Sequence, residues 1–263
     1  MCLIAIAWQA RADMPLVVAA NRDEWRDRAA EPAHWWPDRP DLLAGRDLQA
    51  GGTWLGISRD GRFAAVTNFR DPSDRRSTAR SRGELVADFL AGELDPGAYA
   101  AGVARHAHEY NAFNLLVADT ATLWYFGSRE GPPRPVAPGV HALSNHVLDE
   151  PWPKVVRARR SMESAIREAD PAPALFRMLS DATPATDDEL PRTGVPLDWE
   201  RRLSAALIRG EDYGTRNSTV VIAAAQAPPM LEEWTRDGAG EVILASRNGD
   251  VERPSRRLVP TGA

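Results

Sequence analysis

The sequence is 263 residues long, with 43% apolar and 26% charged residues and a net charge of −5 at neutral pH. This length is enough for one domain with a sizeable core, and we expect a single domain over residues 1–263. The acidic balance argues against nucleic acid as a partner, because nucleic acid requires a basic face. The single cysteine excludes an intrachain disulfide, and it stands at position 2.

The apolar run at residues 3–8 is too short for a membrane helix, and no basic segment precedes it. We interpret it as a buried strand and expect no integral membrane segment. A cytoplasmic location is the corresponding expectation, and it would keep Cys2 reduced. No feature of the sequence predicts an oligomeric state.

The first part of the chain predicts two hairpins, and hence four strands, before the first helix. Gly61 can adopt the positive φ that the second turn needs, and Asp95-Pro96 supplies an N-cap and a first-turn proline. The predicted elements are strands at residues 2–8, 16–21, 53–58 and 62–68, a helix at 82–91, a helix opening at Asp95-Pro96, and strands at 114–119, 122–127 and 140–145.

The second part predicts helices followed by closing strands. The expected elements are helices at 152–169, 174–179 and 198–208, and strands at 215–224, 230–236 and 242–246. The polar loop at 181–196 has two interpretations, a lid or a mobile connection. The order of elements indicates a layered α+β domain in which two sheets pack together with helices outside.

Position 2 makes the cysteine a candidate nucleophile. A lone cysteine is most often a small buried hydrophobic residue, and that interpretation stands beside the functional one. Removal of the initiator methionine, normal before a small second residue, would leave Cys2 with a free α-amine. The ordinary pKa of that amine, about 8, suits a general base at neutral pH. Cys2 could then supply both nucleophile and base.

Charged residues follow the second predicted strand. The first hairpin turns near Ala12, so paired positions have numbers that sum to about 23 or 24. Cys2 is therefore expected beside Asn21 and Arg22. Arg22 can stabilise a thiolate or hold a substrate, and Asp23 can orient the α-amine. A solvated charge cluster at a strand exit is the alternative interpretation.

Two asparagines close predicted strands, Asn68 after residues 62–67 and Asn145 after residues 140–144. An amide NH2 directed at a developing oxyanion is worth about 2.7 to 4 kcal/mol in the transition state. A strand-end asparagine is more often a turn former. Arg216 begins an otherwise apolar strand, so its charge needs a partner at the sheet end, and that partner can be structural.

The stretch Asn21-Arg22-Asp23-Glu24 resembles the signature of the NRDE family, also called the transport and Golgi organisation protein 2 family. The matching stretches that follow are Ala44-Gly45-Arg46-Asp47, Gly51-Gly52-Thr53-Trp54-Leu55-Gly56, Thr67-Asn68-Phe69-Arg70, Ser81-Arg82-Gly83-Glu84-Leu85, Ser144-Asn145-His146, Pro151-Trp152-Pro153-Lys154 and Tyr213-Gly214-Thr215-Arg216. Ala112 departs from the family pattern, which has Gly in this turn.

The resemblance implies an N-terminal nucleophile hydrolase fold, a four-layer αββα sandwich related to choloylglycine hydrolases and penicillin V acylases. It implies a hydrolase of a non-peptide amide bond in an amphipathic acyl substrate, with no required cofactor. By similarity, Asn68 and Asn145 would frame the oxyanion hole and Arg216 would brace the nucleophile, whereas Glu24 has no assigned role. The positions that match the relatives' working set are Cys2, Arg22, Asp23, Asn68, Asn145 and Arg216.

A second hypothesis is a non-catalytic binding or trafficking protein. Eukaryotic members of the family are associated with haem trafficking and lipid homeostasis, so haem or a lipid-like ligand is the alternative partner. Cys2 and His146 would be the candidate haem ligands. No histidine or cysteine spacing typical of a metal site occurs.

Lys154 is the single lysine beside 31 arginines. Retention of an ammonium in so arginine-rich a chain indicates that a compact cation is needed at this position. Chance survival at a helix start is the alternative interpretation, and Lys154 stays outside the predicted catalytic set.

Overall fold

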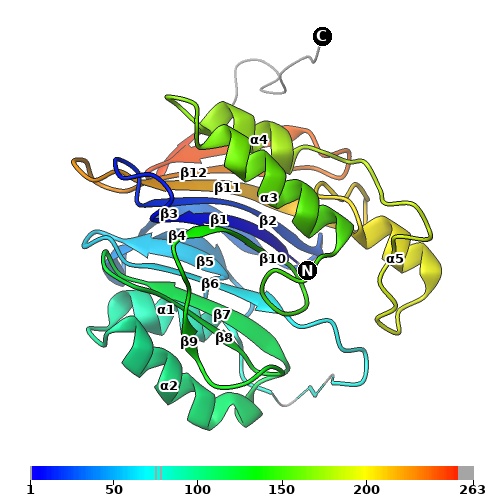
Figure 1. Cartoon of the computed structure of the whole chain (residues 1–263), viewed down its shortest axis with the longest axis horizontal. Helices are drawn as coiled ribbons and strands as arrows, with labels where there is room; N and C mark the ends of the chain where they lie inside the picture. The colour runs from blue at the N-terminus through cyan, green and yellow to red at the C-terminus, as the bar shows by residue number, and fades with distance from the viewer. Residues whose placement is uncertain (1, 75, 78, 254–263) are drawn as a thin grey trace.

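Two antiparallel β-sheets packed face to face form the centre of the molecule, and helices cover both outer faces (Figure 1). On one side lie α3 (Pro153–Ala165) and α4 (Ala172–Leu179), and on the other α1 (Gly83–Ala91) and α2 (Pro96–His106). The predicted four-layer αββα sandwich is thereby confirmed. The structure, a computed structural model, describes residues 2–74, 76–77 and 79–253.

The first sheet carries the N-terminal strand between two neighbours. Its order within the described residues is β10-β1-β2-β11-β12-β13-β14. The strands are β1 (Cys2–Trp8), β2 (Leu16–Trp25), β10 (Gly139–Leu143), β11 (Tyr213–Ala223), β12 (Met230–Arg236), β13 (Val242–Arg247) and β14 (Asp250–Glu252). Every residue of β1 is buried, which suits its unbroken apolar sequence.

The second sheet runs in the order β3-β4-β5-β6-β7-β8-β9 within the described part of the chain. Its strands are β3 (Ala30–Trp36), β4 (Arg39–Asp47), β5 (Leu55–Ser58), β6 (Phe63–Asn68), β7 (Phe113–Ala118), β8 (Leu123–Gly127) and β9 (Arg134–Pro135). Consecutive strands pair along the whole sheet, so it is a meander.

The prediction of four strands before the first helix was wrong, because β3 and β4 also precede α1. Prolines disfavour central strands, and this stretch contains Pro32 and Pro40. The structure accommodates both: β3 is an edge strand, and Pro40 is the second residue of β4. Strand β2 also extends beyond its predicted end, because it pairs with β11 as far as Trp25.

The helix starts follow local signals more closely than the helix ends do. The Asp95 carboxylate accepts a hydrogen bond from the backbone N–H of Ala98 at 2.9 Å, which confirms the predicted start of α2. A short 3₁₀ turn, η1 (Ala107–Glu109), follows that helix. Helix α3 ends at Ala165, before the predicted residue 169. No helix within the described ranges is long and apolar enough to span a bilayer.

Helix α5 (Leu197–Leu203) is shorter than the predicted helix at 198–208. The chain beyond it turns toward β11, where the backbone N–H of Ile208 donates to Oγ1 of Thr215 at 2.9 Å. The N–H of Thr215 donates in return to the Ile208 carbonyl at 2.8 Å. The backbone N–H and carbonyl of Ile208 thus bond to Thr215 of β11 and not to other residues of a helix, so α5 does not extend to residue 208.

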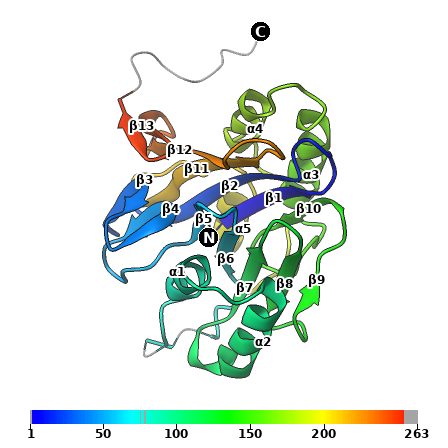
Figure 2. The same cartoon turned by 90° about the vertical axis from the view of Figure 1, so that its left-hand side faces the viewer.

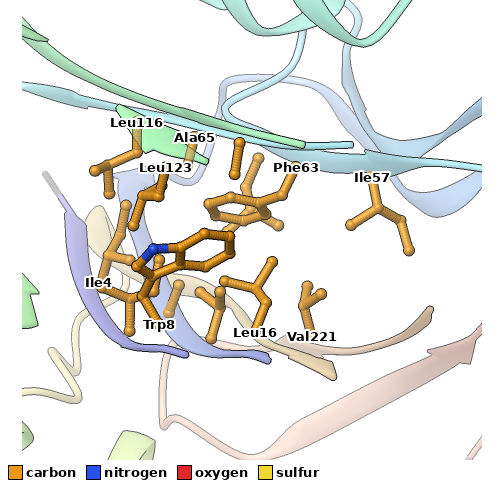
Figure 3. Packing of buried hydrophobic residues seen from close by; sticks show 14 of the residues in the cluster. Ile4, Trp8, Leu16, Ile57, Phe63, Ala65, Leu116, Leu123 and Val221 are labelled. Carbon is orange, nitrogen blue, oxygen red and sulfur yellow. The ribbon is translucent and has the colours of Figure 1, made fainter. Parts of the chain in front are cut away.

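The main core lies between the sheets (Figures 1 and 2). Figure 3 shows apolar side chains from the two inner faces in contact across this space, with the indole of Trp8 close to Phe63. Two further clusters join each sheet to its own helices. The residues labelled in Figure 3 are Ile4, Trp8, Leu16, Ile57, Phe63, Ala65, Leu116, Leu123 and Val221.

A buried ion pair ties α5 to the segment after β6. Nη1 of Arg70 lies 2.6 Å from Oε2 of Glu200, and both side chains are only 4% exposed. The guanidinium also lies over the Trp152 ring, 4.6 Å from its centroid. The other oxygen of Glu200 accepts the Thr193 hydroxyl at 2.6 Å. Each of the two buried charges therefore has a partner of opposite sign.

We expect Glu200→Ala to lower the free energy of unfolding by about 3 kcal/mol or more, because it leaves the Arg70 charge buried and unpaired. Urea denaturation followed by circular dichroism measures this change. Asp198→Ala is the matched control in the same helix, since solvent screens the exposed pair of Asp198 with Arg201 and its loss should change stability far less. Equal losses for the two variants would contradict the assignment.

Candidate active site

A cavity of about 500 Å3 adjoins the first residue of β1. Its wall combines the ends of β1, β2 and β11 with β4 and with the loops before β5 and α1. Most lining side chains are polar or charged, and Trp54 and Val66 are the larger apolar ones among them. Of the predicted site residues, the cavity wall includes Cys2, Arg22, Asp23 and Asn68.

Strand pairing brings Cys2 and Arg22 together. In the β1–β2 ladder, Cys2 lies directly opposite Arg22, which confirms the register predicted from the hairpin turn. The Ser144 hydroxyl donates to the Cys2 carbonyl at 3.0 Å. The side chain of Cys2 is 7% exposed, and burial raises the pKa of its thiol. The thiol therefore stays protonated at neutral pH unless a base removes the proton.

Arg22 is buried and has a free donor group. Its Nη2 lies 3.6 Å from Oε2 of Glu24 and 3.7 Å from Oδ2 of Asp47. Its Nη1 is buried and has no hydrogen-bond partner among the described residues. Glu24, which had no predicted role, thus balances the charge of a guanidinium that keeps a donor available in the cavity wall.

Asp23 follows Arg22 and is almost fully buried. Its Oδ1 accepts the Thr215 hydroxyl at 2.7 Å. Burial raises the pKa of the Asp23 carboxyl, while the ammonium of Lys154 and the hydrogen bond from Thr215 lower it. The hydrogen bond from Thr215 therefore orients this carboxyl, which belongs to the residue directly after Arg22, the partner of Cys2 in the ladder.

Arg216 occupies a β-bulge and does not line the cavity. The register of β11 on β2 shifts between Thr215 and Asn217, so Arg216 is the extra residue. Its Nη1 donates to the backbone carbonyls of Trp25, at 3.3 Å, and of Arg28. The structure thus places Arg216 as a brace for the turn that follows β2, rather than in the cavity wall.

The two predicted asparagines lie side by side but in different surroundings. Nδ2 of Asn145 donates to the Asn68 carbonyl at 2.9 Å, and the Arg70 N–H donates to the Asn145 carbonyl at 2.7 Å. Asn145 is fully buried and lies outside the cavity wall, whereas Asn68 is partly exposed within it. Asn145 therefore fixes the backbone of Asn68, which itself lines the cavity.

Lys154 is buried at the start of α3 against the first sheet. Its ammonium has no hydrogen-bond partner within the described part of the chain. Burial lowers the pKa of Lys154 to about 8, while the negative charge of Asp23 opposes that shift. The single lysine of the chain thus interacts electrostatically with Asp23 of the predicted site.

Two further lining residues, Arg82 and Asn217, were absent from the predicted set. Asn217 lies opposite Arg22 in the β2–β11 ladder, directly after the bulge. Arg82 precedes α1, and it stood within one of the stretches that carry the family resemblance. The family resemblance of that stretch could have indicated Arg82. Nothing in the sequence indicates the bulge that precedes Asn217, so the position of Asn217 could not be predicted.

The candidate haem ligands do not share a cavity. Cys2 lines the cavity and His146 does not. The ring of His146 packs near Phe69 and Trp152, with centroid distances of 4.9 and 5.6 Å, and its Nδ1 lies 3.2 Å from Oε2 of Glu150. The two alternative haem ligands therefore lie in different surroundings.

The loop at 181–196, interpreted from sequence as a lid or a mobile connection, contributes no residue to the cavity wall. Thr193 in this loop is tied to Glu200 of α5. The loop therefore links α4 to α5 away from the lining residues.

The arrangement suits acyl transfer to sulfur. It combines a buried thiol at the start of a strand, a guanidinium with a free donor, an oriented carboxyl and an amide in one wall. A free α-amine on Cys2 would add a base on the same residue as the thiol.

The amino-acid sequence matches one family along most of its length. Residues 1–237 match the family described as Transport and Golgi organisation 2. The Bos taurus Transport and Golgi organization protein 2 homolog is 35% identical over 242 residues, covering 85% of this chain and 87% of the relative. The Homo sapiens homolog is 34% identical over 237 residues, covering 83% and 85%.

The solved structures that match the chain are far more distant in sequence. The Caenorhabditis elegans N-acylethanolamine-hydrolyzing acid amidase ortholog has a TM-score of 0.47 at 10% identity, covering 84% of this chain and 92% of its own. A mutant of the conjugated bile acid hydrolase from Clostridium perfringens has a TM-score of 0.49 at 8% identity, covering 97% of each chain.

The pKa of Lys154 predicts a specific pH dependence of stability. In the folded protein it is lowered from 10.5 to about 8, so between these pH values the unfolded chain binds the extra proton. The free energy of unfolding should therefore rise with pH across this window. Between about pH 7 and about pH 10, we expect the wild type to gain about 2 kcal/mol relative to Lys154→Met.

Urea denaturation of both proteins at the two pH values measures the difference. The subtraction removes groups that titrate equally in wild type and variant. Parallel pH dependence in the two proteins would show that Lys154 keeps an ordinary pKa.

Proposed function

We propose that this chain, which belongs to the Transport and Golgi organisation 2 family, hydrolyses a non-peptide amide bond with Cys2 as nucleophile. The observation that carries the proposal is the position of the only cysteine, buried at the cavity wall directly opposite Arg22 and next to Asp23. The base is the α-amine of Cys2, which removal of Met1 makes available.

The reaction proceeds in two halves. The α-amine takes the thiol proton, the sulfur attacks the acyl carbonyl, and the carbon–nitrogen bond breaks as the ammonium returns a proton to the leaving amine. Water then attacks the thioester, giving up a proton to the α-amine, and the carboxylic acid leaves as the thiol is restored. No cofactor or external oxidant takes part in either half.

The raised pKa of the Cys2 thiol fits this sequence of steps, because the nucleophile then rests as a protonated thiol and is activated during attack. Arg22 supports the proposal because its free Nη1 can stabilise the sulfur anion or hold the substrate. Asp23, held by Thr215, accepts a hydrogen bond from the α-ammonium and keeps it directed at the sulfur.

The oxyanion of the tetrahedral intermediate is assigned to the Asn68 amide. Asn145 acts through Asn68, since it holds that residue's carbonyl. Arg216 acts indirectly, because its hydrogen bonds stabilise the turn after β2. Of these three residues, only Asn68 lies in the cavity wall and can touch the substrate.

The test is turnover of a panel of N-acyl amides by wild type and by Cys2→Ala and Cys2→Ser, with intact mass measured on the same samples. We expect active protein to have lost one methionine residue and Cys2→Ala to lose activity by roughly a thousandfold or more. Circular dichroism checks that the variants fold.

Activity in protein that retains Met1 would rule out the α-amine as base. Absence of turnover across the panel, together with tight ligand binding, would instead favour the non-catalytic binding or trafficking protein.

A further inference from the structure

The cavity wall has a charge opposite to that of the chain. The whole chain carries a net charge of −5, yet six guanidinium groups and four carboxyl groups line the cavity. Burial also raises the pKa of one of those carboxyls, Asp23. The guanidinium groups belong to Arg22, Arg28, Arg46, Arg76, Arg80 and Arg82.

Most of these arginines are paired with carboxylates. Arg46 lies 2.6 Å from Asp38, Arg80 lies within ion-pair distance of Glu84 and Glu109, and Arg28 lies 2.6 Å from Asp47. Arg76 donates to backbone carbonyls and to Asp74. These four side chains are occupied in shaping the wall.

Arg22 and Arg82 differ from the others. Arg22 is 7% exposed, and its Nη1 has no partner among the described residues. Arg82 forms no ion pair with a described carboxylate, and its hydrogen bond there runs from Nη1 to the Ala112 carbonyl at 3.2 Å. Two guanidinium groups therefore retain donors for a ligand at the same cavity.

Two glycines hold Arg82 at this position. The backbone N–H of Thr53 donates to the Gly83 carbonyl at 3.1 Å, which joins the loop before β5 to the start of α1. A Cβ added at Gly52 would lie 2.5 Å from the carbonyl carbon of Gly83, so no other residue fits without a backbone shift. The stretches 51–56 and 81–85, which have no role in the proposed reaction, thus pack against each other and fix the position of Arg82.

Arg82 is also in electrostatic contact with the nucleophile. Both residues line the same cavity. Burial lowers the pKa of the Arg82 guanidinium, and Cys2, when its thiol is ionised, is the largest influence that opposes this shift. Because Arg82 and Cys2 line the same cavity, a group bound by Arg82 and an amide carbonyl presented to the sulfur can belong to one substrate.

We propose that Arg22 and Arg82 together bind an oxyanion group of the substrate, so that the preferred amide is anionic and carries a carboxylate or a phosphate near the scissile bond. This inference rests on the proposed function for the position of the reacting carbonyl. It narrows the expected amphipathic acyl substrate to one with a charged end, and a planar guanidinium is well suited to such a group.

Binding can be tested apart from turnover in the Cys2→Ala background. The probes are N-octanoylglycine, N-octanoyl-O-phosphoethanolamine and the neutral N-octanoylethanolamine, with affinities measured by titration calorimetry. We expect at least one anionic probe to bind about tenfold or more tightly than the neutral one, because hydrogen bonds between charged groups are strong. The two anionic arms distinguish a carboxylate from a phosphate.

Adding Arg82→Gln should abolish this preference, and Arg82→Lys should restore part of it through charge alone. Arg105→Gln is the matched control, since Arg105 is exposed on α2 outside the cavity and should leave the preference intact. Circular dichroism establishes that each variant folds. An equal affinity for all three probes, or the same loss for anionic and neutral probes in Arg82→Gln, would overturn the inference.

Failure of the proposed function would look different. Anionic preference that depends on Arg82, without cleavage of any probe by wild-type protein, would support the oxyanion site and contradict the hydrolase. Cleavage of the neutral probe as fast as the anionic ones would support the hydrolase and contradict the oxyanion site.

Discussion

The pairing of β1 with its two neighbours is the constraint on which the site depends. Because β1 lies between β10 and β2, backbone pairing holds this strand in the interior of the first sheet, and its first residue pairs with β2. The same ladder places Arg22 opposite Cys2, and β11 places Thr215 opposite Asp23. A slip of one residue in either ladder would turn these side chains to the other face of the sheet. The fold thus assembles the candidate site mainly through strand register.

The same arrangement concentrates buried charge at a cost in stability. Asp23 and Lys154 are both almost fully buried. Burial raises the pKa of Asp23 and lowers the pKa of Lys154, so it favours the neutral form of each side chain. Each charge partly offsets the penalty on the other. Desolvated groups of this kind are common at functional sites, because a low-dielectric environment strengthens the interactions that position a reacting atom. The chain concentrates these charges beside its only cysteine.

Local signals made part of this site predictable from sequence. A polar turn between two apolar runs was enough to place Cys2 beside Arg22, since antiparallel pairing determines the register once the turn is known. The bulge at Arg216 could not be foreseen, because one extra residue redirects a side chain without altering the apolar pattern. Arg82 reaches the cavity through a long-range contact between Gly52 and Gly83, which periodicity does not encode. The sequence did not predict β3, because its proline disfavours a strand locally. An edge position in the sheet tolerates that proline, and the local sequence does not show this position.

The central claim is that Cys2 forms a covalent bond to the acyl group. Rapid acid quench of wild-type protein during turnover of an N-acyl amide, followed by intact and peptide mass spectrometry, tests it directly. The account predicts an acyl adduct on the N-terminal peptide that starts at Cys2, and no adduct in Cys2→Ala. Turnover without an adduct at any quench time, or an adduct on another residue, would contradict it.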